Sequence, residues 1–124
     1  MGVPKPLGET EYKEDICTTV DPGICGLPCR IRAHKESTRA VTIDIGRTQC
    51  EQIVRLAKRI DRITLQELFA PLTHNLVCVA AQKAGCHASC PVPVAILKTA
   101  EVAMEMALPK QVIIKFEACD RKEK

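Results

Sequence analysis

Residues 29–45, CRIRAHKESTRAVTIDI, decide the fold of this chain because they predict a β-hairpin with one apolar face. A strand from about Cys29 to His34 and a second strand at residues 41–45 are joined by the polar loop KESTR, residues 35–39. Side chains alternate between the two faces of a strand, so the apolar ones gather on one side. They are Cys29, Ile31, Ala33, Val41, Ile43 and Ile45. We expect helices to cover that face.

Downstream of the hairpin, hydrophobic periodicity predicts helices in succession. The capping box TQCE at residues 48–51 opens the first. Its core-facing stripe is Ile53, Leu56, Ala57 and Ile60. Residues 64–69, TLQELF, predict a short second helix. Asn75 caps a third, LVCVAAQKA, which ends at Gly85.

The last helix and a final strand complete the predicted fold. The helix starts at Cys90-Pro91, runs to about Leu108 and is apolar on most of its surface, so it suits a central core helix or a contact with a second subunit. QVIIKFEA, residues 111–118, predicts a strand. The expected fold class is α+β, an antiparallel β-hairpin plus a carboxy-terminal strand packed against three to four helices.

Length and charge limit the organisation of the chain. Its 124 residues are enough for one domain. We expect a flexible arm at 1–20, a single α+β domain at 21–119 and a charged tail at 120–124. Charges of both signs are mixed along the chain with a net charge of only +3, which argues against a nucleic-acid or membrane surface. No stretch approaches the roughly 18 apolar residues of a membrane span.

Eight cysteines are many for a chain of this length. Secreted domains use such numbers for disulfides, but those folds are small and rich in loops. The amino-terminal sequence MGVPKPLGETEYKED is polar, unlike a secretory signal. We therefore expect a cytoplasmic protein with reduced thiols.

Three cysteines are expected at the beginnings of elements: Cys25 before a strand, and Cys50 and Cys90 at helix starts. A helix amino terminus stabilises a thiolate, so we expect the thiol pKa to be lowered at the two helix starts. A thiolate is both a metal ligand and a sulfur nucleophile. These positions predict metal, iron–sulfur or sulfur-transfer chemistry.

Two further residues lie close in sequence to Cys90. Zinc takes four ligands near tetrahedral geometry, and iron–sulfur clusters also take mainly cysteine. Either Cys86 or His87, in an expected loop, would complete a site with Cys25, Cys50 and Cys90. The cofactor predicted is therefore zinc or an iron–sulfur cluster. We assign no role to Cys17, Cys29, Cys78 or Cys119.

The order of these features resembles a known family. Cys25-Gly26, two strands, Cys50 at a helix start, and His87 with Cys90 before a long final helix are similar to the NifU/IscU-type iron–sulfur cluster assembly scaffolds, over roughly residues 22–107. The resemblance implies that Cys25, Cys50 and Cys90 bind zinc or a nascent [2Fe–2S] cluster, with His87 near the fourth position. The chain also resembles small cysteine-rich proteins of anaerobic archaea.

A second resemblance and a structural alternative stay open. Cys90-Pro91-Val92-Pro93 is similar to the CPxP opening of TusA-type sulfur carriers, which implies a persulfide on Cys90 and no metal. Alternatively, the cysteines only fill the core. Our leading hypothesis is a non-enzymatic protein that handles metal, clusters or sulfur with a protein partner. It binds neither nucleic acid nor membrane, and the apolar last helix suits a homodimer.

Overall fold

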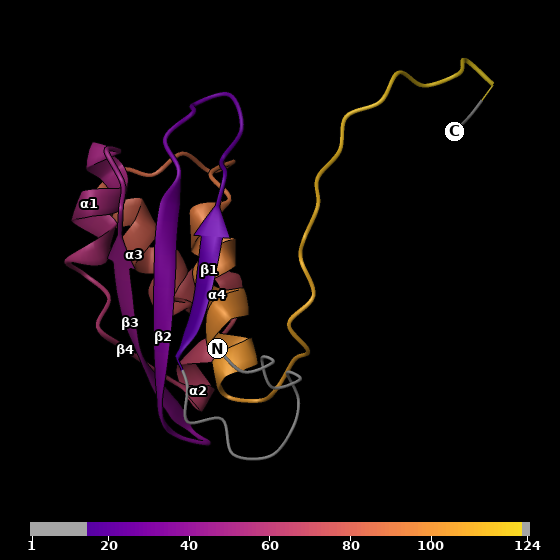
Figure 1. Cartoon of the computed structure of the whole chain (residues 1–124). Helices are drawn as coiled ribbons and strands as arrows, with labels where there is room; N and C mark the ends of the chain where they lie inside the picture. The colour runs from indigo at the N-terminus through magenta and orange to yellow at the C-terminus, as the bar shows by residue number, and fades with distance from the viewer. Residues whose placement is uncertain (1–14, 123–124) are drawn as a thin grey trace, which may run out of the picture.

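The protein is built on one antiparallel sheet whose helices lie against a single face (Figure 1). The computed structural model describes residues 15–122. The strands are β1 (Ile16–Val20), β2 (Cys29–Ser37), β3 (Ala40–Gly46) and β4 (Arg62–Thr64), in the spatial order β1-β2-β3-β4. The helices are α1 (Glu51–Ala57), α2 (Leu65–Leu68), the 3-10 turn η1 (Leu72–His74), α3 (Leu76–Ala84) and α4 (Val92–Ala103). The α+β class predicted from the sequence is confirmed.

The β2–β3 hairpin has the predicted apolar face. Ile31 and Ala33 of β2 are fully buried and pair with Ile45 and Ile43 of β3, which are also buried. Arg32 and His34 alternate with them and are exposed on the open face. Helix α4 lies across β1 and β2, while α1 packs on β3. The alternation along two strands therefore determines which side of the sheet the helices cover.

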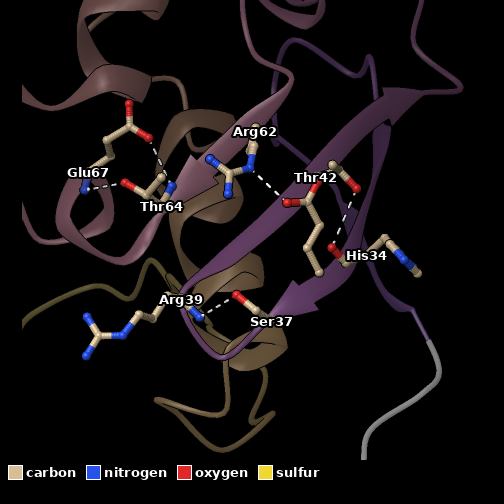
Figure 2. Close-up of polar contacts among 8 residues, drawn as sticks. His34, Ser37, Arg39, Thr42, Arg62, Thr64 and Glu67 are labelled. Atoms are coloured by element: carbon tan, nitrogen blue, oxygen red, sulfur yellow. Dashed lines mark hydrogen bonds and ion pairs between the residues drawn. The ribbon is translucent and has the colours of Figure 1, made fainter.

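Two helix starts show how hydroxyl side chains order the backbone. At α2, Thr64 accepts a hydrogen bond from the Glu67 N–H at 3.2 Å, and the Glu67 carboxylate accepts one from the Thr64 N–H at 3.0 Å (Figure 2). The capping box expected at residues 48–51 is absent. There Thr48 Oγ1 accepts from the Cys50 N–H at 3.1 Å, so Cys50 is itself the N-cap and its side chain makes no capping bond.

Two strands were not anticipated. Residues 16–20, expected to belong to a flexible arm, form β1 at the edge of the sheet, so the domain begins before residue 21. Residues 1–14 of that expected arm lie outside the described residues. The three-residue β4 continues the sheet beyond β3, pairing Thr64 with Ala40. β4 is too short to show a periodic pattern, and ICTTV of β1 has polar residues on both faces, so its alternation is weak.

The carboxy-terminal strand predicted at residues 111–118 is wrong, because this segment pairs with no strand among the described residues. Helix α4 also ends at Ala103 and not near Leu108. Glu105 takes a left-handed backbone with φ of 62°, which stops the helix, and the Met106 N–H turns back to the Glu101 carbonyl at 2.8 Å. The chain then leaves the domain as an extended segment (Figure 1).

Asn75 holds the connection between α2 and α3. Its side chain is buried, and its Oδ1 accepts a hydrogen bond from the Val77 N–H at 3.0 Å as the predicted cap of α3. Its amide nitrogen donates to the carbonyls of Glu67, Leu68 and Ala70 at 3.3–3.4 Å. Gly85, with φ of 80°, ends α3 in the left-handed conformation, as predicted. No helix in residues 15–122 is long and apolar enough to cross a membrane.

We predict that Asn75→Ala lowers the free energy of unfolding by about 2 kcal/mol, because it removes a helix cap and leaves buried carbonyl groups unpaired. Urea unfolding followed by circular dichroism measures this. Asn75→Asp keeps the cap acceptor but turns a buried carboxylate oxygen toward the same three carbonyls, so it should lose at least as much stability as Asn75→Ala. A loss below about 0.5 kcal/mol in Asn75→Ala would contradict this role.

Candidate functional site

Five of the eight cysteines lie at one end of the domain, which we call the cysteine pole: Cys25, Cys29, Cys50, Cys86 and Cys90. The loop between β1 and β2, the start of α1 and the loop between α3 and α4 all meet at this end (Figure 1). Charge on one thiol of the set raises the pKa of another, which requires their sulfur atoms to lie within electrostatic range. The pole therefore gathers thiols from distant parts of the sequence.

Cys25 lies in the loop that joins β1 to β2. Val20 and Cys29 pair across the two strands, so residues 21–28 form a hairpin loop with both ends fixed. Gly23 and Gly26 have φ of 86° and 65°, and the Gly26 N–H donates to the Gly23 carbonyl at 2.9 Å. These left-handed residues turn the chain around the exposed Cys25. The sequence places the thiol at the tip of a turn that has room to move.

Cys29 and Cys50 form the inner part of the pole. Cys29 begins β2 and is 2% exposed within the core. Cys50 caps α1, is half-buried against the core, and its thiol donates to the Gln52 side-chain carbonyl at 3.3 Å. Sequence reasoning did not choose Cys29, because an extended chain would carry it up to about 13 Å from Cys25. In the structure residues 21–28 turn back on themselves in a hairpin loop, so the chain between Cys25 and Cys29 is not fully extended.

Cys86 and Cys90 bracket the loop between α3 and α4. The Cys86 N–H donates to the Ala81 carbonyl at 3.0 Å, which closes the end of α3 after Gly85. The Cys90 N–H donates to the His87 carbonyl at 3.0 Å in a turn, so the predicted loop is present. Both cysteines are half-buried against the core, while the His87 side chain is exposed.

Helix α4 starts two residues after Cys90, because Pro91 is its N-cap. The Val92 N–H at the first turn hydrogen-bonds to Cys90 and lowers the pKa of that thiol. Burial raises the pKa and is the largest effect. The charges of Cys50 and Cys25 raise it further, so the pKa of Cys90 is raised overall. The expectation of a lowered pKa at Cys90 is therefore wrong. The helix terminus acts on this thiol, but removal from water outweighs it.

The pKa values of two other thiols at the pole are also raised. Burial, followed by the charges of Cys90 and Cys50, raises the pKa of Cys29 from 9.0 to about 11. Burial also raises the pKa of Cys86, although the nearby Arg55 guanidinium lowers it in part. Arg55 is held there by a 3.0 Å hydrogen bond from its Nε to the Ala84 carbonyl. At neutral pH these thiols are protonated unless a cation displaces the protons.

The donor atoms suit a soft metal, but their present spacing does not form a finished site. Five thiols and one imidazole exceed the four ligands that zinc or a cluster needs. Within residues 15–122, no three His, Cys, Asp or Glu side chains stand in an arrangement that could hold an ion. Cys17 and Cys119 are exposed and Cys78 is half-buried in α3, and none of the three influences the pKa values of the pole.

By its fold and its candidate site, this protein is a small α+β domain with a cluster of free thiols at one end. A family model described as "Family of unknown function (DUF6951)" matches residues 16–116, and the chain belongs to this family. The match begins at β1 and extends through most of the segment 111–118, so both belong to the family's domain. No curated protein and no solved structure matches this chain.

The raised pKa of Cys29 predicts that the metal-free protein loses stability in alkali. The native state keeps its proton to about pH 11, whereas the unfolded thiol releases it near pH 9. The contribution of this thiol to the free energy of unfolding is thus fully present below the unfolded pKa and is lost as pH rises to the folded one, a change of about 3 kcal/mol. Urea unfolding with a chelator and reductant, over this range, measures the slope.

Cys29→Ala should be less stable below pH 9 and should lose the part of the slope that Cys29 contributes, while Cys86 and Cys90, whose pKa values are also raised, keep the rest. Cys17→Ala, on the exposed side of β1, is the matched control and should keep it. An unchanged slope in Cys29→Ala would show that Cys29 is not responsible.

Proposed function

We propose that the cysteine pole binds one soft metal centre, zinc or an iron–sulfur cluster, and that the protein handles metal, clusters or sulfur for a protein partner without being an enzyme. The ligands we assign are Cys25, Cys50 and Cys90, with Cys86 or His87 in the fourth position. The observation that carries the proposal is the meeting of thiols from three separate loops and helix starts at one end of a small domain.

The electrostatics of the pole favour a cation over an empty site. Charge on the thiols makes each further ionisation harder, because like charges lie close together in a partly buried place. A divalent cation reverses that effect, since it stabilises thiolates and displaces their protons. Without a cation the thiols with raised pKa values avoid this repulsion by keeping their protons. A bound cation would allow several of them to ionise together.

One exposed loop of the pole has the space to close on an ion. Cys25 is exposed at the tip of a loop between two left-handed glycines. No atom lies within 4 Å of where a side chain would begin at Gly23 or Gly26, so this loop has free space around it. Cys50, the N-cap of α1, and Cys90, just before α4, are already half-buried against the core. We infer that Cys25 completes the site by moving toward them.

The persulfide carrier is the weaker alternative for this geometry. A carrier needs an exposed thiolate of low pKa, because the thiolate is the nucleophile. Cys90 is half-buried and its pKa is raised, so both requirements oppose that role. The Val92 hydrogen bond is the one feature that favours it. All eight cysteines are free thiols, consistent with the reducing cytoplasm in which we place the protein.

We predict that Cys50→Ser and Cys90→Ser each weaken zinc binding by about a hundredfold, because a serine hydroxyl does not replace a thiolate on a soft ion. Zinc affinity is measured by competition with a chromogenic chelator under anaerobic conditions. Elemental analysis and the absorption spectrum of anaerobically purified protein distinguish zinc from a cluster. Cys25→Ser should also weaken retention of the metal.

Cys17→Ser and Cys119→Ser are the matched controls, since both thiols are exposed and outside the pole. They should bind zinc as the unaltered protein does. If Cys50→Ser and Cys90→Ser retain zinc equally well, or the controls lose it to the same degree, the shared site is wrong. A metal-free protein whose Cys90 accepts a persulfide would instead support the carrier.

Metal affinity at the pole should rise with pH. The raised pKa of Cys90 keeps its thiol protonated at neutral pH, so binding must release a proton. The apparent affinity then increases by up to about tenfold per pH unit for each such ligand, below its pKa. Zinc titrations between about pH 6 and pH 8, with calorimetry in two buffers of different ionisation enthalpy, measure the slope and the protons released. Equal affinity across that range would contradict thiol ligation.

A further inference from the structure

The segment at residues 111–118, QVIIKFEA, is an apolar strand sequence that lies free in the solvent. Ile113, Ile114 and Phe116 are 68%, 74% and 93% exposed. Figure 1 shows the segment extending away from the sheet and helices. A soluble domain rarely leaves several adjacent large apolar side chains uncovered unless a partner covers them.

The backbone of this segment already has the alternation of a strand. The Lys115 ammonium contacts the Glu117 carboxylate at 3.2 Å, so side chains two residues apart point to the same side. The opposite side therefore carries Val112, Ile114 and Phe116, all exposed. The face with Lys115 and Glu117 also carries Ile113, whereas the other face is wholly apolar, as in an edge strand packed on a helix layer.

β1 offers the matching edge. In the described part of the chain β1 pairs with β2 alone, so its other edge presents unpaired backbone groups. β4, at the opposite edge, has only three residues and leads straight into α2. β1 has five residues, and the Oγ1 atoms of Thr18 and of Thr99 on α4 are hydrogen-bonded at 2.9 Å. Helix α4 therefore lies directly beneath this edge.

The side of α4 next to β1 is the apolar surface that an added strand would cover. Ala95 and Val102 share a stripe with Thr99 at helical spacing, and both are only partly buried. Val112, Ile114 and Phe116 on an added strand would face this stripe. The pairing would satisfy the free backbone edge and cover both apolar surfaces at once.

We propose that residues 111–118 of one copy add as a fifth strand to the β1 edge of a second copy, and that the exchange is mutual, giving a homodimer. The 2.9 Å ion pair of Lys35 with Glu105 ties the exit of the chain to β2. From there Leu108-Pro109 is an extended, stiff step. The segment then projects outward, where a second copy meets it, and does not return to its own edge (Figure 1). This inference is independent of the metal proposal.

Light scattering after size exclusion, at several protein concentrations, tests the proposal. The full-length protein should have twice the 13.6 kDa mass of one chain. Ile114→Asp should raise the dimer dissociation constant by about a hundredfold, because it places a charge on the buried face of the added strand. Lys115→Ala is the matched control on the opposite face and should leave the dimer intact. Circular dichroism confirms folding, which Ile114→Asp should not disturb at so exposed a position.

A mixing experiment tests the exchange itself. Val102→Glu alters the receiving surface, and Ile114→Asp alters the added strand. Each variant alone should be monomeric, but a mixed dimer keeps one unaltered strand on one unaltered edge. Native mass spectrometry should therefore detect the mixed dimer at concentrations where neither variant pairs with itself.

Three outcomes would overturn the proposal. The first is a monomer whose residues 111–118 exchange amide hydrogens freely. The second is a monomer in which they are protected, which means that the segment pairs within its own chain. The third is a dimer that Ile114→Asp does not weaken, which would place the interface elsewhere.

Discussion

The apolar face of the β2–β3 hairpin is the constraint on which the rest of the structure depends. The side chains of Ile31, Ala33 and Val41 on that face are fully buried, and a layer of helices shields them from water. Because successive elements run back and forth across the sheet, the loop before β2, the start of α1 and the loop before α4 return to the same end (Figure 1). The cysteines meet there as a consequence of covering the hairpin. Nothing in their spacing along the chain requires it.

The same burial determines the chemistry available at the pole. A helix amino terminus contributes a hydrogen bond from Val92 to Cys90, but the core and the neighbouring thiols have the larger effect on the pKa. Cys29, Cys86 and Cys90 therefore stay neutral at neutral pH in the absence of a cation. If the pole binds a metal as proposed, the ion must prefer thiolate strongly enough to displace the protons of these three thiols. The Arg55 guanidinium lowers the pKa of Cys86, and so assists ionisation at the edge of the pole.

Much of the fold was predictable because its strongest signals are local. The hairpin alternation, the Asn75 cap and the Gly85 terminus depend on residues close in sequence, and all three are present. β1 was missed because ICTTV is short and has polar residues on both faces, and its pairing with β2 gives no signal in sequence. Because β1 was missed, Cys29 was also overlooked. When Val20 pairs with Cys29, residues 21–28 form a closed loop, and Cys25 within it and Cys29 directly after it both belong to the pole. The strand predicted at 111–118 failed for the converse reason, since its composition is correct but no strand in its own chain pairs with it.

β1 connects the two surfaces that distinguish this protein. Within residues 15–122 one of its edges pairs with no strand, and its last residue, Val20, leads directly into the loop that carries Cys25. A strand added at the free edge would hold β1 between two neighbours, and the beginning of that loop would be held with it. The order of the Cys25 loop thus depends on β1, and the order of β1 depends on what covers its edge. The proposed metal site and the proposed dimer use different residues, but both would act on the same short strand.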